Sequence, residues 1–149
     1  MSVIWITGIS GAGKTTLCNA LYDSLKTKIP HLVKLDGDVV REAFGNDLSH
    51  AEGDRRIQIF RIQRIANVLA DQNLVVLVGA LYAHPKLLTW NRANLREYFE
   101  VYLKVPLDLV KSRDVKGLYA KALAGKMPNV VGIDIPWHEP QNADLVIES

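Results

Sequence analysis

The sequence predicts an α/β fold in which helices cover a parallel sheet. Apolar runs alternate with helical patterns along the chain, which is typical of parallel strands joined by crossover helices. The run 74–78 is apolar throughout, as expected of a strand buried on both faces. A glycine-rich turn joins the first apolar run to the first helical pattern. With 149 residues, the chain has the length of one domain, and we expect residues 1–149 to form a single domain.

Five strands are expected in order along the chain. The first is Val3–Thr7, directly before the glycine-rich turn, and the others lie at 31–35, 74–78, 99–105 and 145–147. Helices are expected at about 14–28 and about 53–71. The second helix has apolar residues near the helical period, at Ile57, Ile62, Ile65, Ala66 and Leu69. The segment 111–140 holds three glycines and three prolines with little periodicity, and we interpret it as a mobile C-terminal lid.

Composition and charge exclude several classes of partner. Hydrophobic residues make up 48% and charged residues 23% of the chain, as in ordinary globular proteins. The net charge of +2 does not suggest a nucleic-acid surface, and no apolar run approaches the ~20 residues of a membrane span. The single cysteine, Cys18, cannot form an internal disulfide, and the N-terminus lacks the features of a signal peptide. We therefore expect a cytoplasmic protein with no nucleic-acid or membrane partner.

Residues 8–15, GISGAGKT, match the pattern G-x-x-x-x-G-K-[ST] of a phosphate-binding loop (P-loop), between a predicted strand and a predicted helix. Glycines let backbone N–H groups turn inward around phosphates, and the helix N-terminus adds a partial positive charge. Lys14 would neutralise the β- and γ-phosphates, and the Thr15 hydroxyl would bind Mg²⁺. The alternative, a glycine-rich turn that binds nothing, does not explain why the pattern lies between a predicted strand and a predicted helix. We expect ATP and Mg²⁺ at Gly8, Ser10, Gly11, Ala12, Gly13, Lys14, Thr15 and Thr16.

Two carboxylates, Asp36 and Asp38, follow the second predicted strand, and Arg41 comes three residues later. In a parallel sheet the carboxyl ends of the strands face one crevice, which here also holds the P-loop. Asp36 can orient the Mg²⁺ shell, and Asp38 can accept a proton from an attacking hydroxyl. Alternatively, Asp38 only caps the next helix, which leaves the second carboxylate unexplained. No N-K-x-D run and no acidic end to the strand 74–78 occurs, so a phosphotransferase is favoured over a guanine-nucleotide switch or a motor ATPase.

The blocks LDGDVVR, VPLDLVKSRDVKGLYAKALAG and VVGIDIPWHEP resemble the adenylylsulfate kinase family in order and spacing, and the resemblance runs from residue 3 to 146. It implies a three-layer α/β/α P-loop kinase fold with five parallel strands and a closing lid. It also implies transfer of the γ-phosphate of ATP to the ribose 3′-hydroxyl of a small nucleotide, adenosine 5′-phosphosulfate (adenylylsulfate). A homodimer is the oligomeric state that we expect.

Matching positions extend the resemblance to single residues. On the acceptor side they are Asp38, Arg41, Arg55, Lys116, Gly117 and Leu118, with Lys116 catalytic, and near ATP they are Arg113 and Asp114. The chemistry of the lid agrees, because positive charge that arrives by closure can stabilise the transferred phosphoryl group and exclude water. For Lys111 and Lys121 we favour the simpler interpretation of a solvated face.

The acceptor side departs from the family pattern. His50 and Val130 occupy the positions of two aromatic residues that stack on the acceptor base, and Gln58 replaces an asparagine. Leu81 and Tyr82 belong to a segment that has lost a serine and an arginine. Loss of an aromatic wall weakens stacking by up to roughly 1–3 kcal/mol. We therefore expect a rebuilt acceptor pocket that discriminates poorly in favour of adenine.

Three functions remain open. The first is an adenylylsulfate 3′-kinase, placed first because adenylylsulfate is the common substrate of the family. The second is the same reaction on another nucleotide, since the altered segment is similar to capsule-pathway kinases that phosphorylate a cytidine diphosphoramidate. The third is a non-catalytic nucleotide-binding subunit. The presence of Lys14, Asp36 and Asp38 argues against it, because a sensor needs no acceptor-side carboxylate.

Overall fold

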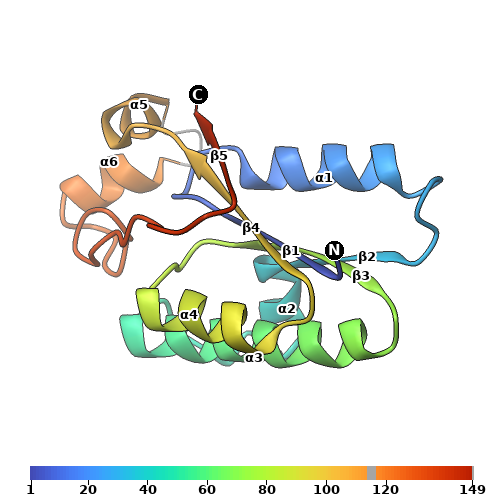
Figure 1. Cartoon of the computed structure of the whole chain (residues 1–149). Helices are drawn as coiled ribbons and strands as arrows, with labels where there is room; N and C mark the ends of the chain where they lie inside the picture. The colour runs from blue at the N-terminus through green and yellow to red at the C-terminus, as the bar shows by residue number, and fades with distance from the viewer. Residues whose placement is uncertain (114–116, 149) are drawn as a thin grey trace.

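The computed structural model describes residues 1–113 and 117–148. In these residues five parallel strands form one sheet in the order β2-β3-β1-β4-β5, which confirms the expected α/β class (Figure 1). The strands are β1 (Val3–Thr7), β2 (Leu32–Asp36), β3 (Val75–Ala80), β4 (Tyr98–Lys104) and β5 (Leu145–Glu148). Because every pairing is parallel, the carboxyl ends of all the strands lie at the same edge of the sheet.

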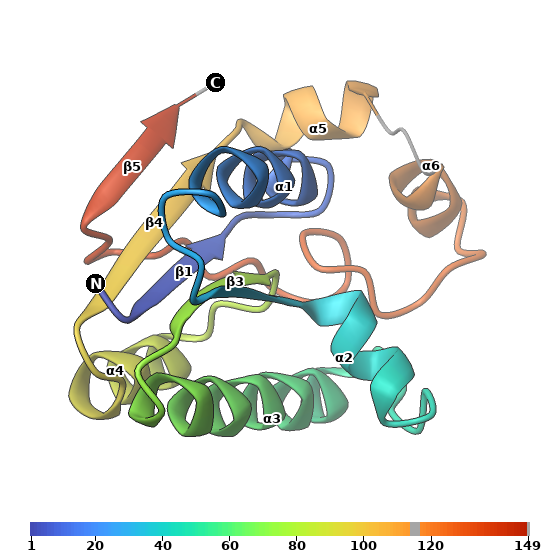
Figure 2. The same cartoon turned by 90° about the vertical axis from the view of Figure 1, so that its right-hand side faces the viewer.

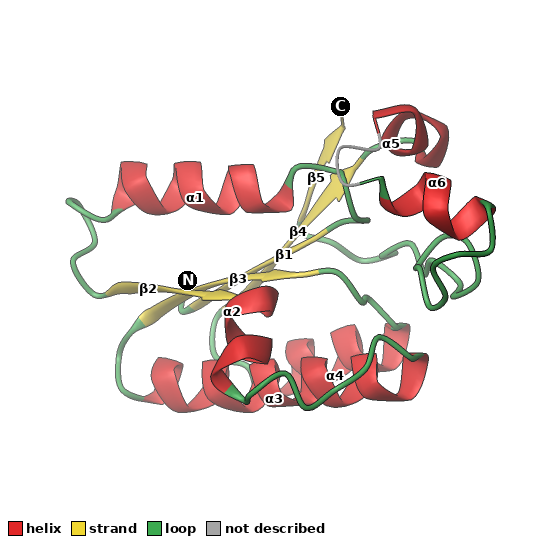
Figure 3. Cartoon of the chain, turned by 180° about the vertical axis from the view of Figure 1, so that it is seen from behind, coloured by secondary structure: helices red, strands yellow, loops and turns green. Residues whose placement is uncertain are grey.

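Helices form a layer on each side of the sheet (Figures 2 and 3). On one side lies α1 (Lys14–Leu25), and on the other lie α3 (Glu52–Asp71) and α4 (Pro85–Asn94). The shorter helices α2 (Gly37–Ala43), α5 (Leu107–Arg113) and α6 (Leu118–Leu123) lie toward the carboxyl ends of the strands. No helix among the described residues is long and apolar enough to cross a membrane.

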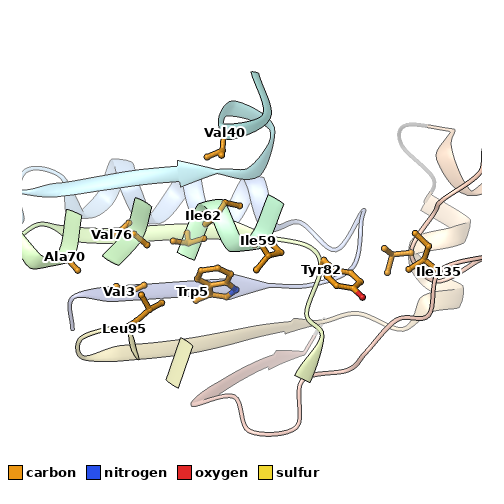
Figure 4. Packing of buried hydrophobic residues seen from close by; sticks show 14 residues of the cluster. Val3, Trp5, Val40, Ile59, Ile62, Ala70, Val76, Tyr82, Leu95 and Ile135 are labelled. Atoms are coloured by element: carbon orange, nitrogen blue, oxygen red, sulfur yellow. The ribbon is translucent and has the colours of Figure 1, made fainter. Parts of the chain in front are cut away.

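The core follows from the alternation of side chains along the two central strands. On β1, Trp5 packs into the cluster beneath α3 together with Ile59 and Ile62 (Figure 4). The next residue, Ile6, packs on the other face with Cys18 of α1. Trp5 and Ile6 have no exposed area. Burying one large apolar side chain contributes about 1.5–3 kcal/mol to stability. The packing of Trp5 and Ile6 therefore stabilises the strand that leads into the P-loop.

Several predicted boundaries are corrected by the structure. The first helix ends at Leu25 and not at residue 28, and β3 continues through Gly79 to Ala80. The bounds of α2 were not predicted from the sequence, and α4 was not predicted at all. Each begins at a side-chain cap, which is Asp36 for α2 and His84 for α4. The segment 111–140 is not all loop, since it contains α6, which directly follows Gly117, where a φ of 64° favours glycine.

Candidate active site

A cavity of about 550 Å³ opens at the carboxyl ends of β1, β2 and β3, where such sheets usually bind ligands. It lies between the P-loop, α2, α3 and the segment 127–131. Many residues that the sequence singled out line it together: Ser10, Lys14, Thr15, Asp36, Asp38, Arg41, His50, Arg55, Gln58, Leu81, Tyr82, Leu118 and Val130. Residues far apart in the chain therefore meet at one site.

The remaining predicted residues are placed differently. Gly8, Gly11, Ala12, Gly13 and Thr16 belong to the P-loop and the start of α1 but are not part of the cavity lining. Arg113 ends α5 and Gly117 precedes α6, and neither is part of the lining. Asp114 and Lys116 lie outside the described residues.

The P-loop leaves its backbone amides available to an anion. Gly13 stands at the N-cap of α1 with a φ of 100°, and no side chain caps the helix there. The first N–H groups of a helix lack intrahelical partners, so this end offers donors and a partial positive charge. At Gly8 a side chain is excluded, because a Cβ would lie 2.8 Å from the Leu103 carbonyl oxygen. The Lys14 ammonium donates to the Ile9 carbonyl oxygen at 3.4 Å.

The two carboxylates after β2 have different surroundings. Asp36 caps α2, because its Oδ1 accepts a hydrogen bond from the Asp38 N–H at 2.8 Å. The alternative that Asp38 is the cap is therefore wrong. Asp38 lies in the first turn of α2, is exposed and lines the cavity, so its carboxylate faces the space where a ligand would bind.

Arg41 and Arg55 hold the loop that follows α2. Arg41 donates to the Ser49 carbonyl oxygen at 3.2 Å, and Arg55 Nε donates to the His50 carbonyl oxygen at 2.8 Å. Arg55 Nη2 also donates to the Asn129 carbonyl oxygen at 2.8 Å, which ties α3 to the segment 127–131. Burial, followed by the charges of Arg41 and Arg55, lowers the pKa of His50. The site thus places an imidazole beside two guanidinium groups.

Gln58 and Tyr82 are held on the same side of the cavity. Gln58 is 5% exposed, and its Nε2 donates to the Gly37 carbonyl oxygen at 2.8 Å. Tyr82 is 3% exposed, and its hydroxyl donates to Glu52 Oε2 at 2.5 Å. Burial, together with this bond to Glu52, raises the pKa of Tyr82. Because its hydroxyl is engaged, Tyr82 offers the cavity its ring.

Sequence reasoning missed other residues of the lining, among them Cys18, Gly79, Met127 and Asn129. Cys18 is 3% exposed, and a Cβ at Gly79 would lie 3.0 Å from its sulfur. Burial, and next the charge of Asp36, raises the pKa of the Cys18 thiol to about 11. Gly79 could have been predicted from the sequence, because it directly follows the apolar run of β3 and so lies near the carboxyl end of that strand.

Comparisons with known proteins agree with this geometry. The sequence model of the family described as "Adenylylsulphate kinase" matches residues 1–148. An adenylyl-sulfate kinase of Deinococcus deserti is 43% identical over 143 residues, covering 96% of this chain and 79% of that protein. A cytidine diphosphoramidate kinase of Campylobacter jejuni is 40% identical over 147 residues, covering 99% and 85%. The structure of the Mycobacterium tuberculosis APS kinase CysC in complex with AMPPNP and APS superimposes with a TM-score of 0.88 at 34% identity, covering 99% of this chain and 87% of that one.

Proposed function

Because the chain belongs to the adenylylsulfate kinase family, and is thus a phosphotransferase, we propose that it transfers the γ-phosphate of ATP to the ribose 3′-hydroxyl of adenylylsulfate. The observation that carries this proposal is the single cavity lined by Lys14 of the P-loop and by Asp38 and Arg55 of the acceptor side. A donor and an acceptor nucleotide would meet there, and positioning supplies much of the catalysis in phosphoryl transfer.

The P-loop would hold the triphosphate, with the amides of residues 8–16 and the Lys14 ammonium around the β- and γ-phosphates. The donor set also fits Mg²⁺, because the Thr15 hydroxyl and the Asp36 carboxylate line the same cavity as hard oxygen ligands. No cluster of three or more His, Cys, Asp or Glu side chains suited to a metal occurs in the described chain. That fits an ion held mainly by phosphates and water, which would neutralise charge on the triphosphate.

On the acceptor side, Asp38 would accept the proton of the attacking 3′-hydroxyl. Arg41 and Arg55 would attract the anionic part of the acceptor, with Gly117 and Leu118 near it. We assign Arg113 and Asp114 to the ATP side and Lys116 to the transferred phosphoryl group, on the resemblance of the KSRDVKGLY block alone.

A second acceptor, cytidine diphosphoramidate, is favoured by one observation. The two positions at which the family pattern has stacking aromatic residues are occupied by His50 and Val130, and both line the cavity. The cavity instead has a tyrosine ring at a third position, Tyr82. Tyr82 fills space that a serine would leave open, which suits a base smaller than a purine. The Campylobacter jejuni relative carries that activity in its name.

The test is an ADP-release assay across adenylylsulfate, cytidine diphosphoramidate, AMP and CMP, with the product examined for a 3′-phosphate. Saturable use of adenylylsulfate supports the first proposal, and preference for the cytidine compound supports the second. ATP binding without phosphoryl transfer to any nucleotide would contradict both and favour a non-catalytic subunit.

We further propose a homodimer in the cytoplasm. What supports the dimer is the edge strand β5, on which Leu145 and Val146 are 45% and 47% exposed. Exposed apolar side chains on an edge strand favour pairing with another surface. Sedimentation equilibrium of the purified protein tests the oligomeric state, and cell fractionation tests the location.

A further inference from the structure

The orientation of the Ser10–Gly11 peptide in the P-loop is set by two hydrogen bonds, one within the loop and one from Tyr119. The Ala12 N–H donates to the Ile9 carbonyl oxygen at 3.0 Å, which closes a four-residue turn with Ser10 and Gly11 at its centre. Gly11 has a φ of 87°, the value that a type II turn requires at its third residue. In a type I turn, the same central peptide would be turned over.

Tyr119 contacts this peptide from α6. Its hydroxyl donates to the Ser10 carbonyl oxygen at 2.6 Å. Tyr119 is 2% exposed and packs in an apolar cluster with Ile9 and Ala12 of the P-loop. Ser10 lines the cavity and Tyr119 does not, so the tyrosine meets the loop from outside the cavity.

The direction of one amide follows from this contact. No cis peptide bond occurs in the described chain, and in a trans peptide the C=O and the N–H point in opposite directions. With the Ser10 oxygen directed toward Tyr119, which stands outside the cavity, the Gly11 N–H is directed away from Tyr119. Turning this peptide over would instead direct a carbonyl oxygen at the phosphates, which repels them.

We propose that Tyr119 is a positioning residue for ATP: it holds the Ser10–Gly11 peptide so that the Gly11 N–H is aimed at the triphosphate. The inference rests on the proposed function in one respect, that the P-loop binds ATP. An amide oriented before the ligand arrives costs no reorganisation at binding or in the transition state.

Tyr119→Phe tests this, because it keeps the ring in the cluster and removes only the hydroxyl. Since one hydrogen bond contributes a factor of about 3 to 10, we expect calorimetric ATP affinity to fall by that factor without acceptor present. The acceptor KM at saturating ATP should not change. Tyr98→Phe is the matched control, since Tyr98 also donates a hydrogen bond of 2.6 Å, to Glu100, away from the P-loop. It should lower thermal stability but keep ATP affinity.

A general loss of stability is separated from positioning by a double-mutant cycle with Gly11→Ala. Alanine disfavours the positive φ, so the peptide orientation should already be lost and Tyr119→Phe should then add little. Additive effects, or ATP affinity unchanged in Tyr119→Phe while the unmodified protein binds ATP, would overturn this inference alone. Absence of ATP binding by the unmodified protein would overturn the proposed function as well.

Discussion

The Asp36 carboxylate accepts a hydrogen bond from the Asp38 N–H at 2.8 Å, so two acidic side chains two positions apart have separate surroundings. One oxygen of Asp36 is engaged in capping α2, whereas the Asp38 side chain extends into the cavity. Because the cap fixes the first turn of α2, it also fixes where the Asp38 carboxylate stands relative to Lys14. A helix cap thereby positions the group that we propose as the general base.

Asp38→Asn should lower kcat by roughly 10²–10⁴-fold, the usual contribution of a general base, because the amide cannot accept the hydroxyl proton. ATP affinity should stay nearly unchanged. Steady-state kinetics and calorimetry measure the two effects. Asp23→Asn is the control, since Asp23 is an exposed carboxylate of α1. A variant that kept its maximal rate and lost ATP affinity would instead make Asp38 a ligand of the nucleotide or metal.

Lys14→Ala should reduce turnover by at least roughly 10²–10³-fold, because it removes a positive charge from the developing negative charge of the transition state. The melting temperature should change little, since Lys14 is half-buried at the cavity and is not part of the apolar clusters. Lys28→Ala, at an exposed lysine beyond the end of α1, is the control. Wild-type turnover in Lys14→Ala would contradict the assignment of the ATP site.

The sequence predicted those parts of the molecule whose signals are local. The glycines and Lys14 identify the P-loop by spacing alone, and apolar runs identify the central strands. Parallel topology then brings the end of β2, with Asp36, to the P-loop. The sequence therefore predicted that the P-loop and the two carboxylates meet, and residues of both line the cavity.

Long-range contacts to backbone atoms were not predictable. Arg55 reaches the Asn129 carbonyl oxygen across 74 positions, and Tyr119 reaches the Ser10 carbonyl oxygen across 109. A carbonyl group is the same in every residue, so such a contact leaves no pattern in the sequence. The helix α4 was missed for a different reason. Its start depends on one hydrogen bond, which the His84 imidazole accepts from the Lys86 N–H, and so short a helix shows little apolar periodicity.

The Cys18 thiol should titrate near pH 11 in the folded protein, compared with an ordinary pKa of 9.0. Its raised pKa contributes stability that is fully present below pH 9.0 and lost as the pH rises through about 11. The pH dependence of alkylation by iodoacetamide measures this, with the urea-unfolded protein as the reference. A folded-state midpoint equal to that of the unfolded chain would mean that burial does not protect the thiol. Cys18→Ala should abolish the labelling.

His50→Phe should strengthen adenylylsulfate binding by roughly fivefold, because phenylalanine stacks on adenine better than imidazole does, a gain of about 1 kcal/mol. His50 is exposed at the cavity, so the larger ring has room there. Val130 differs, since it is 2% exposed and packs in one cluster with Ile9 and Tyr119. Val130→Phe should therefore overfill the cluster and reduce the free energy of unfolding by about 1–3 kcal/mol.

Acceptor titrations and urea denaturation of the two variants separate these effects. His50→Phe should change affinity without changing stability, and Val130→Phe should change stability whatever its effect on affinity. The acceptor panel then decides between the two nucleotides. If His50→Phe improves adenylylsulfate and weakens the cytidine compound, His50 discriminates between the bases. Equal effects on both acceptors would show that the imidazole does not distinguish the bases. Tyr82 would then be the residue to test for base selection.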